Sequence, residues 1–366
     1  MRSTARQRRA SGPVRALCVV AALVAATPTL AACGHLRARL QAVSTSAPAP
    51  AAGITTLQIA PTATNPALVD PSHPDLVALD PAAPSNGELF VFFPGTGGQP
   101  DCCTLLVEAA ARLGYHAIGL TYQNTQAVGE LCKNDLTCYG TVRLDDFNGT
   151  APSSFSDVAP DQSIAARLAD LLSYLASKYP SEGWSPFLNG SQVDWGVTVV
   201  AGHSQGGGDA AFIAKVERTE GVVMLSSVVD STSTSPPVAA TYLTTGHLTP
   251  LSRYVGFDHT GDPFYPKIRA DWTALGLGGL GPATSVDHQS APYAGSHQLI
   301  TSVAVPPAIL ATHDSTAVDS ATPMCPDGTP EFAPVWRYMM QVAGGLPIVG
   351  GPATDGSGPC NASDRG

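Results

Sequence analysis

Continuous apolar runs alternate with stretches of helical periodicity from about residue 87 onward. The runs at residues 89–93, 197–201 and 222–225 are typical of strands that are buried on both faces of a parallel sheet. Further strands are expected at residues 116–120, 252–256 and 299–303. This alternation predicts an α/β fold with a mostly parallel central sheet and helices on both faces.

Residues 102–113 and 164–175 repeat leucine and alanine at helical spacing, so each is expected to form a helix with one buried face. Asp101 and Asp161 precede these segments and are the expected N-terminal caps. Pro180 is expected to stop the second helix, because proline cannot continue the hydrogen-bond ladder.

The strand at residues 197–201 leads directly into Gly202-His203-Ser204-Gln205-Gly206, and a helix-compatible stretch follows. This sequence fits the pattern G-x-S-x-G, in which a serine on a sharp strand-to-helix turn exposes its hydroxyl above the sheet edge. Small flanking residues let the cramped backbone avoid collisions. The pattern predicts Ser204 as a nucleophile and the Gln205 amide as an oxyanion donor. The other interpretation is a glycine-rich turn with an incidental serine.

Residues 200–208 resemble the nucleophile turn of the α/β-hydrolase superfamily, in particular of its bacterial esterase and lipase-like members. The resemblance covers roughly residues 87–338, and the turn is its specific part. It implies an α/β-hydrolase fold with a second oxyanion-hole amide in the loop after the strand at residues 89–93. In the sequence Pro94-Gly95-Thr96-Gly97-Gly98, the resemblance assigns that amide to Thr96.

A serine hydroxyl needs a histidine to take its proton, and the histidine needs a carboxylate to orient it. The order expected in this superfamily is serine, acid, histidine. Asp262 follows a late expected strand and Asp230 follows the strand before it, so both are candidates. Asp262 is favoured because Pro263 fits a loop that ends before a new helix, whereas Asp258 lies too close to the strand end.

His313 is the favoured base, because it comes after the last expected strand and ahead of a short helix. His297 is the alternative, although it opens that strand and therefore lies at the wrong end of it. The remaining histidines of this region are expected to be structural: His203, His247, His259 and His288.

The first 32 residues carry an arginine-rich start, an apolar stretch and the sequence Leu30-Ala31-Ala32-Cys33. This layout is typical of a secretory signal and resembles a bacterial lipoprotein signal, which implies an exported chain held at a membrane through a lipid on Cys33. An ordinary secretion signal is the alternative. The expected divisions are a signal at 1–32, an Ala/Pro/Ser-rich tether at 33–85, a catalytic domain at 86–345 and a tail at 346–366. Residues 50–82 leave room for one or two outer strands, whose places the sequence does not fix.

Hydrophobic residues make up 44% of the 366 residues and charged residues only 13%, which favours a large core and an exported protein. Removing the five arginines of the leader would take the net charge from −10 to −15, so no nucleic-acid partner is expected. No H-E-x-x-H or paired Cys-x-x-Cys pattern occurs, so no metal or other cofactor is expected.

Six cysteines remain when Cys18 in the leader and Cys33 at the lipid site are set aside, and an even number in an exported chain implies disulfides. Cys132 and Cys138 flank a short polar loop and are expected to pair. A bond between Cys325 and Cys360 would tie down the tail. It would leave Cys102 and Cys103 as an adjacent pair or as partners of other cysteines.

These patterns and the resemblance predict a serine hydrolase that cleaves a small-molecule or lipid-like carboxylic ester through an acyl-enzyme. Two alternatives stay open. One is a thioesterase or amidase on the same fold. The other is a surface-anchored binding protein that has kept the fold without an aligned triad. The sequence indicates neither the acyl chain length nor the oligomeric state.

Overall fold

The computed structural model describes residues 53–68, 73–305, 307–308, 310–348 and 360. The predicted signal, the lipid site at Cys33 and most of the predicted tail lie outside these residues. Across the described part of the chain, no helix is both long enough and apolar enough to cross a membrane.

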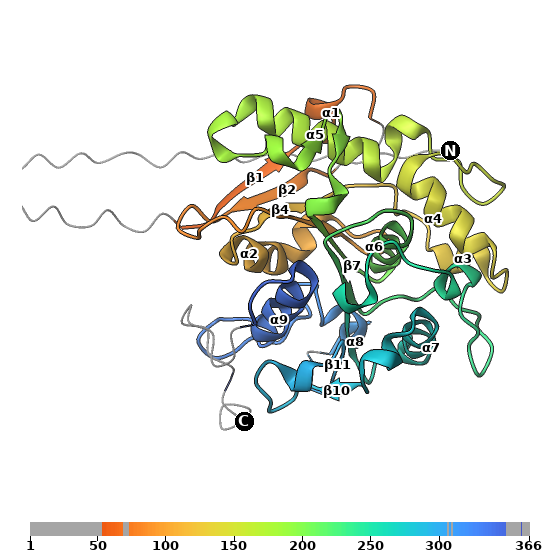
Figure 1. Cartoon of the computed structure of the whole chain (residues 1–366). Coiled ribbons are helices and arrows are strands. Elements are labelled where there is room, and N and C mark those ends of the chain that lie inside the picture. Colours follow the sequence, from red (N-terminus) through yellow and green to blue (C-terminus); the bar gives the residue numbers. More distant parts are fainter. Residues whose placement is uncertain (1–52, 69–72, 306, 309, 349–359, 361–366) are drawn as a thin grey trace, which may run out of the picture. The chain divides into compact units, whose positions relative to one another are not determined.

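Nine strands of the described chain form one sheet in the order β1-β2-β4-β3-β7-β8-β9-β11-β10. Figure 1 labels β1, β2, β4, β7, β11 and β10 of this sheet. The pairs β1–β2 and β2–β4 are antiparallel and the remaining pairs are parallel, so the predicted mostly parallel α/β architecture is confirmed. The strands are β1 (Thr55–Ile59), β2 (Asp75–Leu79), β3 (Leu89–Phe93), β4 (His116–Gly119), β7 (Thr198–His203), β8 (Gly221–Leu225), β9 (Tyr254–His259), β10 (Thr284–Ser285) and β11 (Gln298–Thr301). A separate small hairpin consists of β5 (Leu188–Asn189) and β6 (Gln192–Val193).

The folded region begins earlier than the expected boundary at residue 86. Strands β1 and β2 belong to the predicted tether, yet they extend the sheet beyond β4. Val77 in β2 is buried, and so is the Asp75 carboxylate, which accepts a hydrogen bond from the Thr121 amide at 2.7 Å. These partners lie more than 40 residues away in the chain, so the local composition of the tether did not reveal them.

Side chains of β3 alternate between two hydrophobic clusters on opposite faces of the sheet. Val91 belongs to the cluster on one face, which includes residues of α4 (Cys138–Asn148), α5 (Ile164–Lys178), α6 (Gln205–Val216) and α7 (Tyr265–Leu275). Phe90 belongs to the cluster on the other face, which includes residues of α2 (Thr104–Arg112) and α9 (Ala333–Gly344). Helices therefore cover both faces, and the sheet core lies between them.

Both predicted helix caps are wrong, because tertiary or neighbouring groups supply the acceptors. The Asp319 carboxylate accepts from the Leu105 amide of α2 at 3.2 Å, while Asp101 lies inside a preceding 3-10 turn, Pro100–Cys103. The Ser163 hydroxyl accepts from the Ala166 amide and caps α5 in place of Asp161. Helix α5 ends at Lys178, just before Pro180, as the sequence predicts.

The described residues also form three short α-helices: α1 (Pro61–Thr64), α3 (Val128–Cys132) and α8 (Ala311–Asp314). A disulfide between Cys132 and Cys138 joins the end of α3 to the start of α4, and a second disulfide joins Cys325 to Cys360. Both predicted pairings are confirmed. Cys102 and Cys103 are left next to each other without another cysteine partner among the described residues.

Candidate active site

Ser204 occupies the turn between β7 and α6, with φ 53° and ψ −117°. A non-glycine residue rarely adopts such a backbone, and holding it there costs roughly 1–3 kcal/mol. The surrounding hydrogen bonds maintain it: the Ser204 amide donates to the Leu225 carbonyl at 3.0 Å, and the Ser227 hydroxyl donates to the Ser204 carbonyl at 2.8 Å. Neighbouring strand β8 and the segment after it therefore fix the turn that presents Ser204.

Close backbone packing explains two of the glycines at this turn. A Cβ at Gly206 would overlap the Phe93 carbonyl at the end of β3, and a Cβ at Gly202 would overlap the Gly206 carbonyl. A larger residue at position 206 would have to push the turn away from the end of β3, and one at position 202 would have to push the start of α6 away from β7. The predicted need for small residues around Ser204 is confirmed by these approaches.

The loop after β3 approaches the same turn and holds Thr96 beside Gln205. The Thr96 hydroxyl donates to Gln205 Oε1 at 2.7 Å. Within the described residues, neither the Thr96 amide nor the Gln205 amide donates to a protein acceptor. Gln205 is also the first residue of α6, so its amide lies at the positive end of that helix dipole.

Asn124 and Tyr122, in the segment that follows β4, fix this loop. The Asn124 side-chain amide donates to the carbonyls of Gly95 at 2.7 Å and Gly98 at 2.9 Å, and the Asn124 carbonyl accepts from the Gly97 amide. The Tyr122 hydroxyl donates to the Pro94 carbonyl at 2.8 Å. The only signal in the sequence is their position just after a strand, which does not identify these partners.

Asp262 and His313 are hydrogen-bonded to each other, as the sequence predicts. His313 lies in α8, and its Nδ1 is 2.6 Å from Asp262 Oδ2. A carboxylate oxygen accepts, so Nδ1 carries the proton and Nε2 is the nitrogen that can accept one. Burial opposes the charge on Asp262, but the hydrogen bond and positive charge from His313 outweigh it and lower the pKa of this carboxyl.

Asp258 lies at the end of β9, close to Asp262, and is also buried. Burial and the negative charge of Asp262 raise the pKa of Asp258 well above its ordinary value. The interaction between the two carboxyls therefore favours ionisation of Asp262, next to His313, over ionisation of Asp258.

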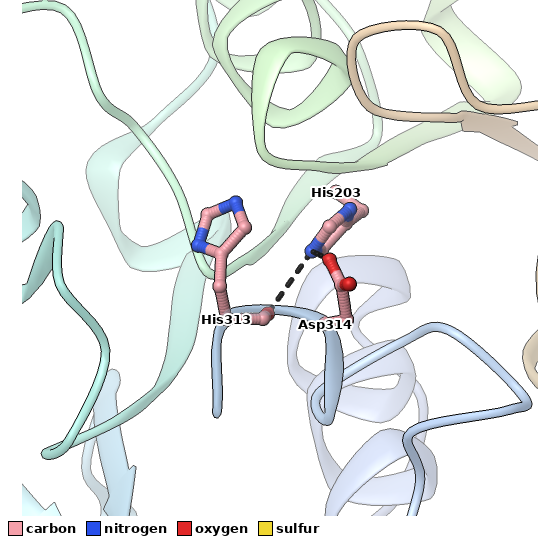
Figure 2. Close-up of side chains that lie close together, drawn as sticks. All are labelled: His203, His313 and Asp314. Carbon is pink, nitrogen blue, oxygen red and sulfur yellow. Dashed lines mark hydrogen bonds and ion pairs between the residues drawn. The ribbon is translucent and has the colours of Figure 1, made fainter. Parts of the chain in front are cut away.

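The His313 ring contacts two other rings. Figure 2 shows it beside His203, and the centroids of these two rings are 4.9 Å apart. The Phe264 ring lies edge-to-face with the His313 ring, with the centroids 5.0 Å apart. His203 is buried, and its Nε2 donates to the His313 carbonyl at 3.1 Å (Figure 2). This contact confirms the prediction that His203 has a structural role.

A cavity of about 490 Å³ opens above the turn, and Ser204, His313, Thr96 and Gln205 all line it. Apolar side chains form much of the remaining wall, among them Val128, Val229, Phe264, Leu310 and Val318. Among the described residues, neither the Ser204 hydroxyl nor His313 Nε2 has a hydrogen-bond partner. The two groups therefore share the cavity without being hydrogen-bonded to each other.

A buried arginine contacts the turn that carries Ser204 and Gln205. Arg143 of α4 donates to the Gln205 carbonyl at 2.8 Å and binds Asp230 through two hydrogen bonds, at 3.0 and 2.8 Å. Its Nη1 is also 2.9 Å from Asp209 Oδ1 in α6. Burial raises the pKa of Asp209 to about 6, against the opposing effect of Arg143. Partners that lie 62 to 87 residues along the chain from Arg143 leave no local sequence signal.

The alternative acid lines the same cavity but is bound by other partners, whereas the alternative base is not among the residues that line it. Asp230 is bound by Arg143 and also accepts from the Tyr242 hydroxyl at 2.7 Å. His297 lies at the opposite end of β11 from the cavity, with its Nδ1 2.7 Å from the Tyr254 carbonyl. His247 contacts Lys215, and His259 is hydrogen-bonded to the Val303 carbonyl and the Gly261 amide.

His203, His313 and Asp314 offer ligand atoms within 4.8 Å of one another, and they are the group of described residues that comes closest to a metal-binding set. The fit to a metal ion is poor. His203 Nε2 uses its proton to bond the His313 carbonyl, and His313 Nδ1 uses its proton to bond Asp262. A metal would have to displace at least the first of these bonds, because ligand nitrogens must be deprotonated.

Comparison with known proteins assigns no family to this chain: no protein-family model matches it, and no curated protein is detectably similar to it in sequence.

Proposed function

We propose that this protein is a serine hydrolase of the α/β-hydrolase fold that cleaves carboxylic esters. One observation carries the proposal: a strained serine between a parallel strand and a helix opens into the cavity that a hydrogen-bonded His313–Asp262 pair also lines. The mostly parallel sheet with helices on both faces is compatible with this fold. Strained backbone of this kind tends to gather at functional sites.

In the proposed reaction, the Ser204 hydroxyl attacks the carbonyl carbon of the ester and His313 Nε2 takes its proton. Asp262 stabilises the imidazolium through the bond to Nδ1. The imidazolium then protonates the departing alcohol, which leaves an acyl group on Ser204. Water attacks this acyl-enzyme with His313 again as base, and the carboxylic acid is released.

The Thr96 and Gln205 amides are proposed to bind the negative oxygen of the tetrahedral intermediate. Their support is that both residues line the cavity and that neither amide has an acceptor among the described residues. Donors held in place before the reaction lose little free energy to reorganisation, and one such donor is worth roughly a hundredfold in rate or more. Arg143 and Asn124 act as positioning residues, because they hold the Gln205 carbonyl and the Gly95–Gly98 loop.

A panel of p-nitrophenyl esters of graded acyl length tests the proposal. Wild-type protein should release nitrophenol with saturation kinetics, and Ser204→Ala should reduce turnover to the uncatalysed rate without changing the unfolding temperature. Ser233→Ala is a matched control, since it removes a hydroxyl from the wall of the same cavity that contacts Lys267 and not the Ser204 turn. Equal activity of wild type and Ser204→Ala would contradict the proposal.

The second candidate is a binding protein without catalysis, and one observation favours it. No hydrogen bond joins Ser204 to His313 among the described residues. In many enzymes such bonds tighten only when substrate is bound, so this geometry alone does not decide between the candidates. Thioester and amide substrates in the same panel distinguish ester cleavage from thioesterase or amidase activity.

We further propose that the chain is exported and held at a membrane by a lipid on Cys33. The two disulfides support export, because such bonds persist in oxidising compartments. Metabolic labelling with a radioactive fatty acid should mark the wild-type chain and leave Cys33→Ala unlabelled. Equal labelling of both would contradict the anchor, and no labelling of either would favour an ordinary secretion signal.

A further inference from the structure

Cys102 and Cys103 lie between the proposed oxyanion loop and α2. Both belong to the 3-10 turn Pro100–Cys103, which begins two residues after Gly98. Cys103 is fully buried, whereas Cys102 is half-buried and lines the catalytic cavity. The pair is therefore in the wall of the site, next to the loop that carries Thr96.

Their two sulfur atoms are 2.6 Å apart. Non-bonded heavy atoms settle at about 3.5–4.0 Å, while the sulfurs of a disulfide are about 2.05 Å apart. The pairing of the other cysteines also favours a bond between Cys102 and Cys103, because the other four cysteines in the described residues already form disulfides. No second partner is available there for either thiol.

We propose that Cys102 and Cys103 form a reducible disulfide that holds the wall of the catalytic cavity. The effect on catalysis rests on the proposed function, whereas the bond itself does not. Adjacent Cα atoms across a trans peptide are about 3.8 Å apart, below the usual range of about 4.4–6.8 Å for disulfides. A bond between neighbouring residues is consequently strained, and strained disulfides are the easily reduced ones.

Thiol–disulfide exchange with a low-molecular-weight disulfide such as glutathione disulfide forms the bond. The half-exposed Cys102 loses its proton and attacks one sulfur of glutathione disulfide, and one glutathione thiolate leaves. The Cys103 sulfur then loses its proton and attacks Cys102 Sγ, which expels the second glutathione. The two cysteines have together lost two protons and two electrons, and glutathione disulfide has become two glutathione molecules.

The contacts of the turn link it to both sides of the site. The Cys102 carbonyl accepts from the Asp319 amide at 2.8 Å, and the Asp319 carboxylate caps α2 at the Leu105 amide. Val318, the neighbour of Asp319, lines the cavity. The Cys102 amide donates to the Gln99 carbonyl at 3.0 Å, just after the oxyanion loop. Opening the disulfide would free the turn that connects these segments.

Peptide mapping of the full chain tests the bond without any assay of activity. The protein is treated with glutathione disulfide, alkylated under denaturing, non-reducing conditions and digested with trypsin. The peptide between Arg39 and Arg112 contains Cys102 and Cys103 as its only cysteines. It should escape alkylation and be lighter than the dithiol form by two hydrogen atoms. Alkylation at both cysteines, or a link to glutathione or another peptide, would overturn the proposal.

Titration with dithiothreitol tests whether the bond between Cys102 and Cys103 is reduced more easily than the Cys132–Cys138 disulfide. Cys102 and Cys103 should become alkylatable at lower dithiothreitol concentrations than Cys132 and Cys138. The reverse order would overturn the claim. At the concentration that opens only the adjacent pair, kcat/KM for a nitrophenyl ester should fall on the order of tenfold, because small displacements in a site are costly.

Two double variants complete the design. Cys102→Ser/Cys103→Ser should lose the response of kcat/KM to dithiothreitol, whereas Cys132→Ser/Cys138→Ser, which removes the same number of thiols, should keep it. An unchanged kcat/KM after selective reduction of wild-type protein would overturn the claim that the disulfide holds the wall of the catalytic cavity. If the protein hydrolyses no ester at all, the proposed function fails, but the peptide map still decides the disulfide.

Discussion

Two buried aspartates follow neighbouring strands of the sheet and meet opposite partners. Asp262, after β9, is hydrogen-bonded to His313, while Asp230, after β8, is locked to Arg143. An imidazole can release and accept a proton near neutral pH, but a guanidinium keeps its charge. Both carboxylates are buried and follow a strand, so these features do not distinguish them. The side chain bound to the aspartate, an imidazole or a guanidinium, decides whether the aspartate can support proton transfer.

The largest expected effect comes from exchanging the two carboxylates for amides. Asp262→Asn should lower kcat by about 10⁴-fold, because the amide no longer stabilises the imidazolium or its tautomer. Asp230→Asn should change kcat little and should mainly lower stability, because it weakens the Arg143 pair. Steady-state kinetics of both variants on one ester measures the difference. A larger loss of kcat in Asp230→Asn would reverse the assignment.

Next in size is the loss of the buried arginine. Arg143→Met should lower the free energy of unfolding by about 3–5 kcal/mol, since Asp209 and Asp230 are left buried without a cation. Urea unfolding followed by circular dichroism measures it. Arg143→Lys, which keeps the charge but cannot make the paired hydrogen bonds, should lose less. Equal losses in the two variants would show that charge plays no part on this side of the cavity.

A smaller effect is expected where α6 touches the arginine. A Cβ at Gly208 would overlap the Arg143 guanidinium, so Gly208→Ala should cost about 1–3 kcal/mol of stability. Gly129→Ala is the matched control in another helix, because no atom lies within 4 Å of a Cβ at that position. That control should be neutral or slightly stabilising. Urea unfolding of both variants tests the pair, and equal stability would mean that Arg143 has room to shift.

The smallest expected effect is on the pH dependence of stability, and it comes from His203, which contacts His313. Burial, together with the nearby His313, lowers the pKa of His203 to about 3, against an ordinary value of 6.5. A base whose pKa is lower in the folded state stabilises the protein above pH 6.5 and loses that contribution as pH falls towards 3. His203→Gln, which keeps a donor near the His313 carbonyl, should therefore have a shallower loss of stability between pH 6 and about 4.

Unfolding free energies at several pH values compare wild type with His203→Gln, and the difference between their slopes is at most about 1.4 kcal/mol per pH unit. Parallel slopes would mean that His203 does not titrate differently on folding. Arg143 gives no such dependence in this range, since its pKa is raised well above its ordinary value: Asp209 and Asp230 outweigh the effect of burial.

Local sequence patterns were sufficient for the elements whose partners are close in the chain. The apolar run of β3, the strand-turn-helix around Ser204 and the Cys132–Cys138 pair could all be predicted because each depends mainly on adjacent residues. The order of acid and histidine along the chain also placed Asp262 and His313 together, although here the resemblance to a family contributed.

Local sequence patterns did not predict contacts between residues that are far apart in the chain. Arg143 lies in an acidic helix with low amphipathicity, and nothing near it in the sequence reveals Asp230 or the Gln205 carbonyl as partners. The cap from Asp319 reaches α2 from more than 200 residues away, so the adjacent Asp101 was the obvious but wrong choice. The outer strands β1 and β2 could be expected somewhere in residues 50–82 but not placed, because β2 depends on its pairing with β4 and β1 on its pairing with β2.

The reactivity of Ser204 tests the central claim most directly. A fluorophosphonate probe should attach once per chain, and peptide mapping should place the adduct on Ser204, with labelling greatly slowed in His313→Gln, which cannot take the serine proton as imidazole does. Wild-type protein that stays unlabelled, or that is labelled at another residue, would contradict the assignment of Ser204 as a nucleophile activated by His313.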